Sequence, residues 1–249
     1  MPRAPFDRLD HRPWPLPERP WIMRQRWLDL LFAHWPVSVE AVRPLVPEPL
    51  EIDTFEGRTF VGVVPFRMED VAPRGIPALP WLSAFPELNV RVYVRRDGVA
   101  GVWFLSLEAA RRLAVWIARG TYALPYVWAH MTCDRPGDTV TYASRRLEGS
   151  PHEFRATYRS EGPMFEAEPG SLDHFLCERY ALFARRTGGT LLRADIHHGP
   201  WPLQRATATF ERNDLTEAHG FQVDALAPPI LHFSEGVKVA IWNPRPEVS

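Results

Sequence analysis

The sequence predicts an α+β protein built mainly from antiparallel β-structure. Nine runs are rich in β-branched and aromatic residues, and turn signals such as Pro136-Gly137-Asp138 separate them. Only three stretches have a helical pattern, and no internal repeat or long polar linker divides the chain. Strands that follow one another through short turns are typical of antiparallel sheets, so we expect one large sheet system with few helices.

The chain begins with a stretch of little periodicity. Residues 1–20 are rich in Pro, Arg and Asp, which predicts an extended N-terminal arm packed through Trp14 and Trp21. Apolar residues are spread evenly beyond this point. We therefore expect residues 21–249 to form a single domain.

The predicted strands follow in order along this domain. Residues 58–68, 87–96 and 101–107 come first, and Asp97-Gly98 between the second and third is a strong hairpin signal. The later strands are expected at residues 126–134, 138–146, 152–160, 191–199, 203–211 and 230–242.

Three helices are predicted between these strands. A short one spans residues 38–46, and a longer one spans 108–119 before the stop signal Gly120. The third spans 171–186 and begins at Ser171, a good N-cap. We expect the two longer helices to pack on the sheet through their apolar stripes.

Composition and motifs argue against several classes of binding partner and cofactor. The 249 residues are 45% hydrophobic and 24% charged with a net charge of −1, which argues against nucleic acid or an anionic membrane surface as a partner. No signal peptide or spanning apolar run is present, so we expect a cytoplasmic protein. Cys133 and Cys177 form no metal motif, and no phosphate-binding or dinucleotide loop occurs, so neither metal nor cofactor is expected.

The segment "FPELNVRVYV" (85–94) raises the main functional question. Leu88, Val90, Val92 and Val94 alternate with polar residues, so one face of the strand is apolar and the other carries Glu87, Asn89, Arg91 and Tyr93. The polar face either meets solvent or lines a pocket. If the face is buried, Glu87 and Arg91 could pair, because unpaired buried charges are costly.

Several stretches resemble the YqjF-like family of uncharacterised conserved proteins. They occur in one order over residues 26–242: "RWLDLLFAHWPVSVEAVRPLVPEPLEIDTFEGRTFVGVVPFRM", "FPELNVRVYV", "GVWFLSLEA", "YALPYVWAHM", "GSLDHFLCERYALF", "HHGPWPLQRA" and "LHFSEGV". The resemblance implies a fold similar to acetoacetate decarboxylase, with a β-barrel core around an interior pocket. It therefore favours the pocket for the polar face of residues 87–93.

The same resemblance argues against a Schiff-base mechanism. Acetoacetate decarboxylase uses a lysine that forms an imine. The comparable stretch here is "RGTYALPY", in which Tyr126 stands at the lysine position and Arg119 begins the motif. Lys238 is the only lysine and lies far from this stretch. The segment "PELNVRV" resembles the one that supplies a pocket glutamate, which points to Glu87.

These residues give a candidate site. Glu87 would orient a ligand or move a proton, and Tyr126 would donate a hydrogen bond. Arg91 or Arg119 would pair with a carboxylate, with Asn89 beside them. Trp103, Trp128 and Trp201 are candidates for an apolar wall. Glu178 is expected on a solvated helix face, and the adjacent His197 and His198 point to opposite faces and do not chelate a metal together.

The leading functional hypothesis is a pocket for a small carbonyl or carboxylate compound, used by a lyase, hydratase or isomerase without a Schiff base. One alternative is a binding or sensing module without catalysis. Another is an oligomeric scaffold whose pocket is filled by its own side chains. A small-molecule partner and a possible homo-oligomer are therefore the partner expectations.

Overall fold

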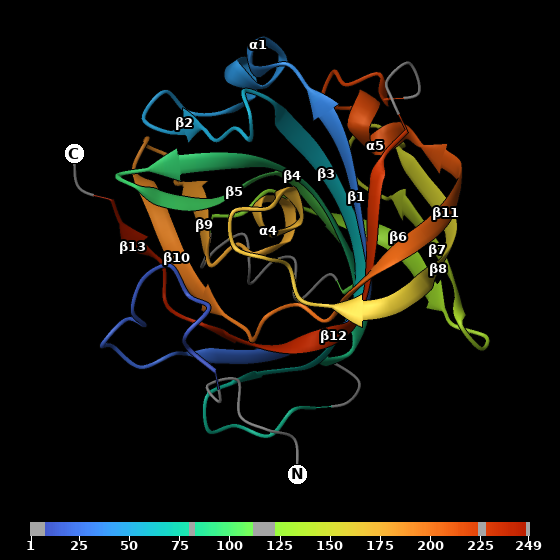
Figure 1. Cartoon of the computed structure of the whole chain (residues 1–249), viewed down its shortest axis with the longest axis horizontal. Helices are drawn as coiled ribbons and strands as arrows, with labels where there is room; N and C mark the ends of the chain where they lie inside the picture. Colours follow the sequence, from blue (N-terminus) through green and yellow to red (C-terminus); the bar gives the residue numbers. More distant parts are fainter. Residues whose placement is uncertain (1–7, 80–82, 112–122, 224–227, 248–249) are drawn as a thin grey trace.

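The structure is a computed structural model that describes residues 8–79, 83–111, 123–223 and 228–247 (Figure 1). Its strands are β1 (Met23–Val37), β2 (Glu51–Ile52), β3 (Thr59–Pro73), β4 (Phe85–Arg96), β5 (Val99–Ala109), β6 (Tyr126–Asp134), β7 (Thr139–Arg146), β8 (Glu153–Phe165), β9 (Ala181–Arg185), β10 (Leu191–His197), β11 (Leu203–Asn213), β12 (Ile230–Ile241) and β13 (Arg245–Pro246). The helical elements are α1 (Val39–Val42), η1 (Arg43–Leu45), α4 (Leu172–Cys177) and α5 (Asp214–Glu217).

The described strands form one sheet, in the order β13-β10-β9-β5-β6-β7-β8-β11-β12-β1-β3-β4-β2. Its pairings are antiparallel except β5–β6 and β5–β9, which confirms the mainly antiparallel prediction. All nine predicted runs are strands. The hairpin between β4 and β5 turns at Asp97 and Gly98, whose φ angles are 49° and 78°, as a two-residue hairpin turn requires.

The prediction of two main helices was wrong where the structure tests it. In the stretch 171–186, α4 ends at Cys177, and Ala181–Arg185 instead forms β9 between β5 and β10. Pairing on both edges buries this segment, and that tertiary gain outweighs its helical apolar pattern. The predicted helix 108–119 begins inside β5, and its residues 112–119 lie outside the described residues.

Strand β1 was not predicted, yet it is central to the fold. It pairs with β12 on one side and β3 on the other, and its middle is fully buried. Leu30 and Phe32 point into one apolar core, whereas Leu31 and Ala33 point into another. A strand that is buried on both faces lacks the apolar–polar alternation by which strands are recognised.

The sheet folds back on itself, because β4 also pairs with β5 and β10 also pairs with β12. Figure 1 shows α4 near the centre of the view, with β9 and β10 on one side and β6, β7, β8 and β11 on the other. Both faces of β4 are consequently buried. Leu88, Val90, Val92 and Val94 belong to one core, and Phe85 and Tyr93 belong to the other.

The described part of the N-terminal arm packs on the sheet. His11 bonds the carbonyl of His198, and Arg12 donates to the carbonyl of Ile196 at 2.8 Å. Trp14 and Trp21 each stack with an arginine, as 5.7 Å and 5.1 Å separate their ring centres from Arg12 and Arg74. Within the described ranges, no helix has both the length and the apolar character that crossing a membrane requires.

Candidate functional site

A cavity of about 330 Å³ lies against the polar face of β4. This volume is at the lower end of the range for small-molecule sites. Most of its lining is apolar and comes from β1, β3, β5 and β10, together with Trp201. The described lining also includes charged and amide side chains: Gln25, Glu87, Asn89, Arg91 and Arg179.

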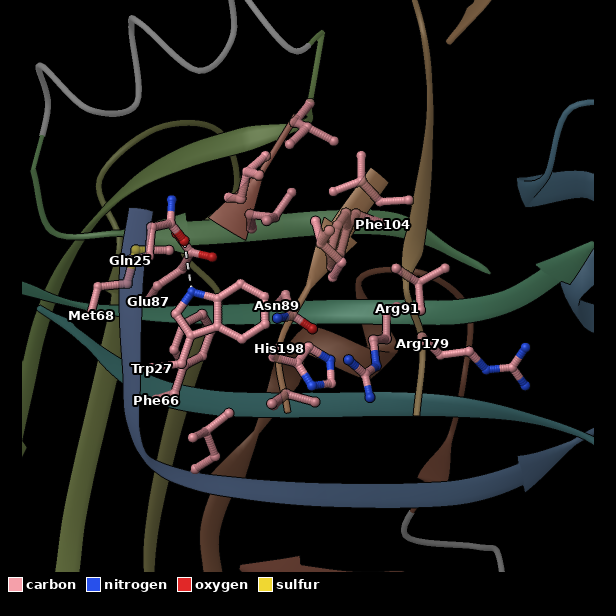
Figure 2. Close-up of a pocket in the computed structure, with 18 of the residues that line it drawn as sticks. Gln25, Trp27, Phe66, Met68, Glu87, Asn89, Arg91, Phe104, Arg179 and His198 are labelled. Atoms are coloured by element: carbon pink, nitrogen blue, oxygen red, sulfur yellow. Dashed lines mark hydrogen bonds between the residues drawn. The ribbon is translucent and has the colours of Figure 1, made fainter. Parts of the chain in front are cut away.

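Glu87, Asn89 and Arg91 form a polar row along β4 (Figure 2). Alternate residues of a strand point to the same face and lie about 7 Å apart, so the row spans about 13 Å. The three side chains are 3%, 6% and 9% exposed. The polar face of this strand is therefore not a solvent face.

Glu87 is a neutral acid at pH 7. Burial raises the pKa of its carboxyl to about 8, and the negative charge of Glu108 adds to this effect. The hydroxyl of Tyr126 donates to Oε2 at 2.8 Å, which opposes the rise in pKa only in part. The structure thus brings Glu87 and Tyr126 together at one end of the polar row, with Tyr126 also lining the cavity.

Arg91 is a buried cation without a carboxylate partner among the described residues. Its Nη2 donates to the carbonyl of Leu176 at 3.0 Å and to the hydroxyl of Tyr93 at 3.4 Å. Its buried Nε has no hydrogen-bond partner within that part of the chain. The possible pair of Glu87 with Arg91 does not form; the carboxyl of Glu87 is bonded by Tyr126 instead.

Arg179 provides a contrast within the same cavity. Its Nη1 lies 2.6 Å from Oδ2 of Asp53, and its Nε donates to the carbonyl of Phe175 at 2.8 Å. Arg179 thus has a carboxylate partner, which it shares with Arg95. Arg91 is left as the cavity cation whose charge the described residues do not balance.

Aromatic rings form the walls above the polar row. The indoles of Trp27 and Trp201 stack at 6.1 Å, and Phe32 meets Trp201 edge-on at 5.0 Å. Gln25 accepts a hydrogen bond from Trp27 Nε1 at 2.7 Å (Figure 2). His198 lines the same wall, and burial lowers the pKa of its imidazole to about 4, so it is neutral.

The remaining candidates lie elsewhere. Trp128 packs against the core cluster and is not among the described residues that line the cavity. Arg119 lies outside the described residues. Lys238, the only lysine, lies on β12 opposite Arg26 and does not line the cavity. The described lining of the cavity therefore contains no lysine that could form an imine.

The burial of Glu178, which directly follows α4, also differs from expectation. Glu178 was expected on a solvated face but is buried, where its carboxylate accepts hydrogen bonds from Tyr180 and from the backbone N–H of Trp201. Sequence reasoning also missed several lining residues, because they come from the unpredicted β1 and from the mistaken helix: Gln25, Trp27, Cys177 and Arg179.

Comparisons with known proteins agree with this architecture. The profile of DUF2071, described as an uncharacterised conserved protein, matches residues 24–238. The uncharacterised protein YqjF of Bacillus subtilis (strain 168) is 42% identical over 239 residues, which cover 96% of this chain and 98% of YqjF.

Solved structures with the same fold are much more distant in sequence. An acetoacetate decarboxylase-like enzyme from Sphingomonas wittichii RW1 is 14% identical, with a TM-score of 0.65 over 91% of this chain and 93% of that one. The enduracididine biosynthesis enzyme MppR, complexed with pyruvate, is 13% identical with a TM-score of 0.62 over 93% of this chain and 91% of that one. At these identities the likeness shows the fold alone.

Proposed function

Because the chain belongs to the DUF2071 family of uncharacterised conserved proteins, its family assigns no activity, and we propose one from the cavity. The protein binds a small carboxylate or carbonyl compound in this cavity. It acts on that compound as a lyase or isomerase through acid–base chemistry, without a Schiff base.

The observation that carries this proposal is the uncompensated charge of Arg91. A buried cation is stable only when an anion or a dense set of acceptors replaces its water. Arg91 has two neutral acceptors, the Leu176 carbonyl and the Tyr93 hydroxyl, and no ion pair with the described residues. A guanidinium forks onto a carboxylate through two parallel hydrogen bonds, so a carboxylate fits the missing partner.

The acid–base step is assigned to Glu87 and Tyr126. A carboxyl with a pKa of about 8 holds its proton at pH 7 and can still release it, which is the property a general acid needs. Tyr126 fixes its orientation through the 2.8 Å hydrogen bond. Glu87 and Arg91 share one face of β4 with Asn89 between them, so a ligand that extends along this row from a carboxylate at Arg91 has its far end at the proton donor.

Relatives of the same fold support the ligand class. One is described as an acetoacetate decarboxylase-like enzyme, and MppR was solved with pyruvate, a carboxylate next to a carbonyl. Acetoacetate and pyruvate are both small carboxylates that carry a carbonyl group. We infer that the shared fold offers this chain a cavity of suitable size for the same class.

We infer further that the sheet is a barrel-like core within one domain. The additional pairings β4–β5 and β10–β12 close circuits of strands that the linear order leaves open. A closed circuit removes exposed sheet edges and encloses a side-chain-lined interior, which is where the cavity lies.

The proposal is tested by ligand binding to Arg91→Gln. Keto acids and other monocarboxylates of increasing chain length are screened by thermal shift, and the best ligand is titrated by calorimetry. Loss of a charged hydrogen-bonding partner removes about 1.5 to 3 kcal/mol, so the Kd should rise about 10- to 150-fold. Arg155→Gln, an exposed arginine on β8 outside the cavity, is the matched control and should leave the Kd unchanged.

Binding that is equally strong in Arg91→Gln would refute the assignment of the anion site. Turnover of the bound ligand, followed by NMR in wild type and Glu87→Gln, tests the second half of the proposal. Binding without turnover of any bound ligand would leave a binding module and remove the acid–base step.

A further inference from the structure

Cys177 lines the cavity from the last position of α4. Its side chain is 2% exposed, and its Sγ lies 4.0 Å from Nδ1 of His232. Arg91 donates to the carbonyl of the preceding residue, Leu176, so the uncompensated guanidinium lies close to this thiol. A carboxylate bound to Arg91 would therefore place its neighbouring carbon near Sγ.

His232 is oriented by a carboxylate on its other side. Its Nε2 lies 2.9 Å from Oδ1 of Asp173, and Arg205 holds both oxygens of Asp173 at 3.0 and 2.7 Å. Asp173 and Cys177 are four residues apart on α4, a spacing that places two side chains on one helix face. A proton on Nε2 leaves the lone pair of Nδ1 directed at the thiol.

We propose that Cys177, His232 and Asp173 form a nucleophile, base and orienting carboxylate in the wall of the cavity, and that Cys177 adds to an electrophilic carbon of the compound held by Arg91. This inference rests on the proposed function, because Arg91 supplies the anchor. The arrangement has the parts of an activated nucleophile: a thiol, an adjacent base and a third group that fixes the base.

The step is balanced without a further reactant. The sulfur forms a bond to the carbonyl carbon while the π-electron pair of that carbonyl moves onto its oxygen. Nδ1 of His232 takes the thiol proton and passes it to the oxygen, which becomes a hydroxyl. The product is a hemithioketal, and the reverse step restores the thiol and the carbonyl.

The surroundings keep both Cys177 and His232 neutral at rest. Burial raises the pKa of Cys177 well above its ordinary value. Burial also lowers the pKa of His232, so its imidazole is neutral and can accept a proton. The nucleophile therefore depends on His232 for deprotonation, unlike a cysteine that is a thiolate at rest.

The position of Arg205 bears on which ring nitrogen of His232 carries the proton, and therefore on whether His232 can act as the base. Its Nη1 lies 2.7 Å from Nε2 of His232, as well as bonding Asp173. If Nε2 accepts from Arg205, the imidazole proton is on Nδ1 and the thiol has no base. The two arrangements predict different effects of replacing His232 on the reactivity of Cys177.

The test uses iodoacetate and iodoacetamide, reagents of similar size that differ in charge. In alkylation the sulfur–carbon bond forms, iodide leaves with its electron pair, and the thiol proton goes to Nδ1 of His232. The full chain has two cysteines, so peptide mapping gives the rate at Cys177 with Cys133, a half-buried residue on β6, as the internal reference.

In wild type we expect iodoacetate to label Cys177 faster than iodoacetamide does. The labelling rate should level off at high iodoacetate concentration, because the reagent first binds at Arg91. His232→Gln should slow labelling of Cys177 by about 100-fold or more, the usual contribution of a general base, with Cys133 unchanged. Arg91→Gln should abolish the preference for iodoacetate and leave the iodoacetamide rate intact. The pH profile of the Cys177 rate should lose its dependence on an imidazole in His232→Gln.

The possible failures are distinguishable. If neither reagent labels Cys177 while keto acids still bind in an Arg91-dependent way, the nucleophile is wrong and the proposed function stands. If His232→Gln does not slow labelling, His232 is not the base. If Arg91→Gln leaves the reagent preference unchanged, the anion site itself is wrong. A changed Cys133 rate would indicate a folding defect, and His232→Asn would then replace His232→Gln.

Discussion

Replacing Glu87 by glutamine should stabilise the protein at neutral and alkaline pH. The wild-type carboxyl has an ordinary pKa of 4.5 and a pKa of about 8 in the folded protein. Below pH 4.5 both states hold the proton. Between pH 4.5 and about 8 only the folded state holds it, so unfolding releases a proton and becomes easier as the pH rises.

The magnitude follows from this window. Stability changes by about 1.4 kcal/mol per pH unit for one proton, so Glu87 lowers the free energy of unfolding by roughly 3 to 5 kcal/mol once the pH passes about 8. The glutamine side chain of the variant has no proton to lose, and its amide oxygen can still accept from Tyr126. The variant should therefore match wild type near pH 4.5 and exceed it increasingly up to about pH 8.

Urea denaturation of both proteins from about pH 4.5 to about pH 9.5, a range that spans the two pKa values, provides the measurement. Other titrating groups are common to both chains, so the difference between the two free energies of unfolding isolates Glu87. Glu51→Gln, at an exposed position on β2, is the control and should show no trend with pH. A difference that stays flat, or a variant that becomes weaker as the pH rises, would show that Glu87 is ionised in the folded protein and would refute the neutral-acid assignment.

Two further predictions concern the hydrogen bond to Glu87 and a close backbone approach beside the cavity wall. Tyr126→Phe removes the hydrogen bond that lowers the pKa of Glu87, so this pKa should rise further and about 1 kcal/mol of stability should be lost. In urea denaturation, the pH above which the free energy of unfolding stops falling because of Glu87 should therefore be higher than in wild type. An unchanged pH would contradict this. Gly236→Ala should cost about 3 kcal/mol or more by urea denaturation, because φ is 133° and the added Cβ would clash with the carbonyl oxygen of Trp27. Gly57→Ala, also at positive φ but with open space around it, should cost only about 1 to 2 kcal/mol, and equal losses would rule out the steric explanation.

Much of the fold could be predicted because the β-structure is locally encoded. The alternation in β4 and the Asp97-Gly98 turn both depend on residues adjacent in sequence, and both are present in the structure. Strand β1 and strand β9 could not be predicted in this way. Strand β1 pairs on both edges with strands distant in the chain, and β9 lies between β10, which follows it directly, and the distant β5. Both strands are buried on both faces, so their sequences show no alternation with solvent.

The candidate site was likewise predicted only in part. The sequence by itself determined that Glu87, Asn89 and Arg91 share one face of a strand, because side chains alternate every residue. It also determined that the chain has one lysine, at position 238.

Only the tertiary structure decided what covers that face. Residues of β1, β10 and α4 line the same cavity, and they come from segments far from β4 in the order of the chain. This burial makes Glu87 a neutral acid, leaves Arg91 without a counter-charge among the described residues and places Cys177 beside His232. Such properties depend on the exclusion of water by distant parts of the chain, and a local pattern of residues does not specify that exclusion.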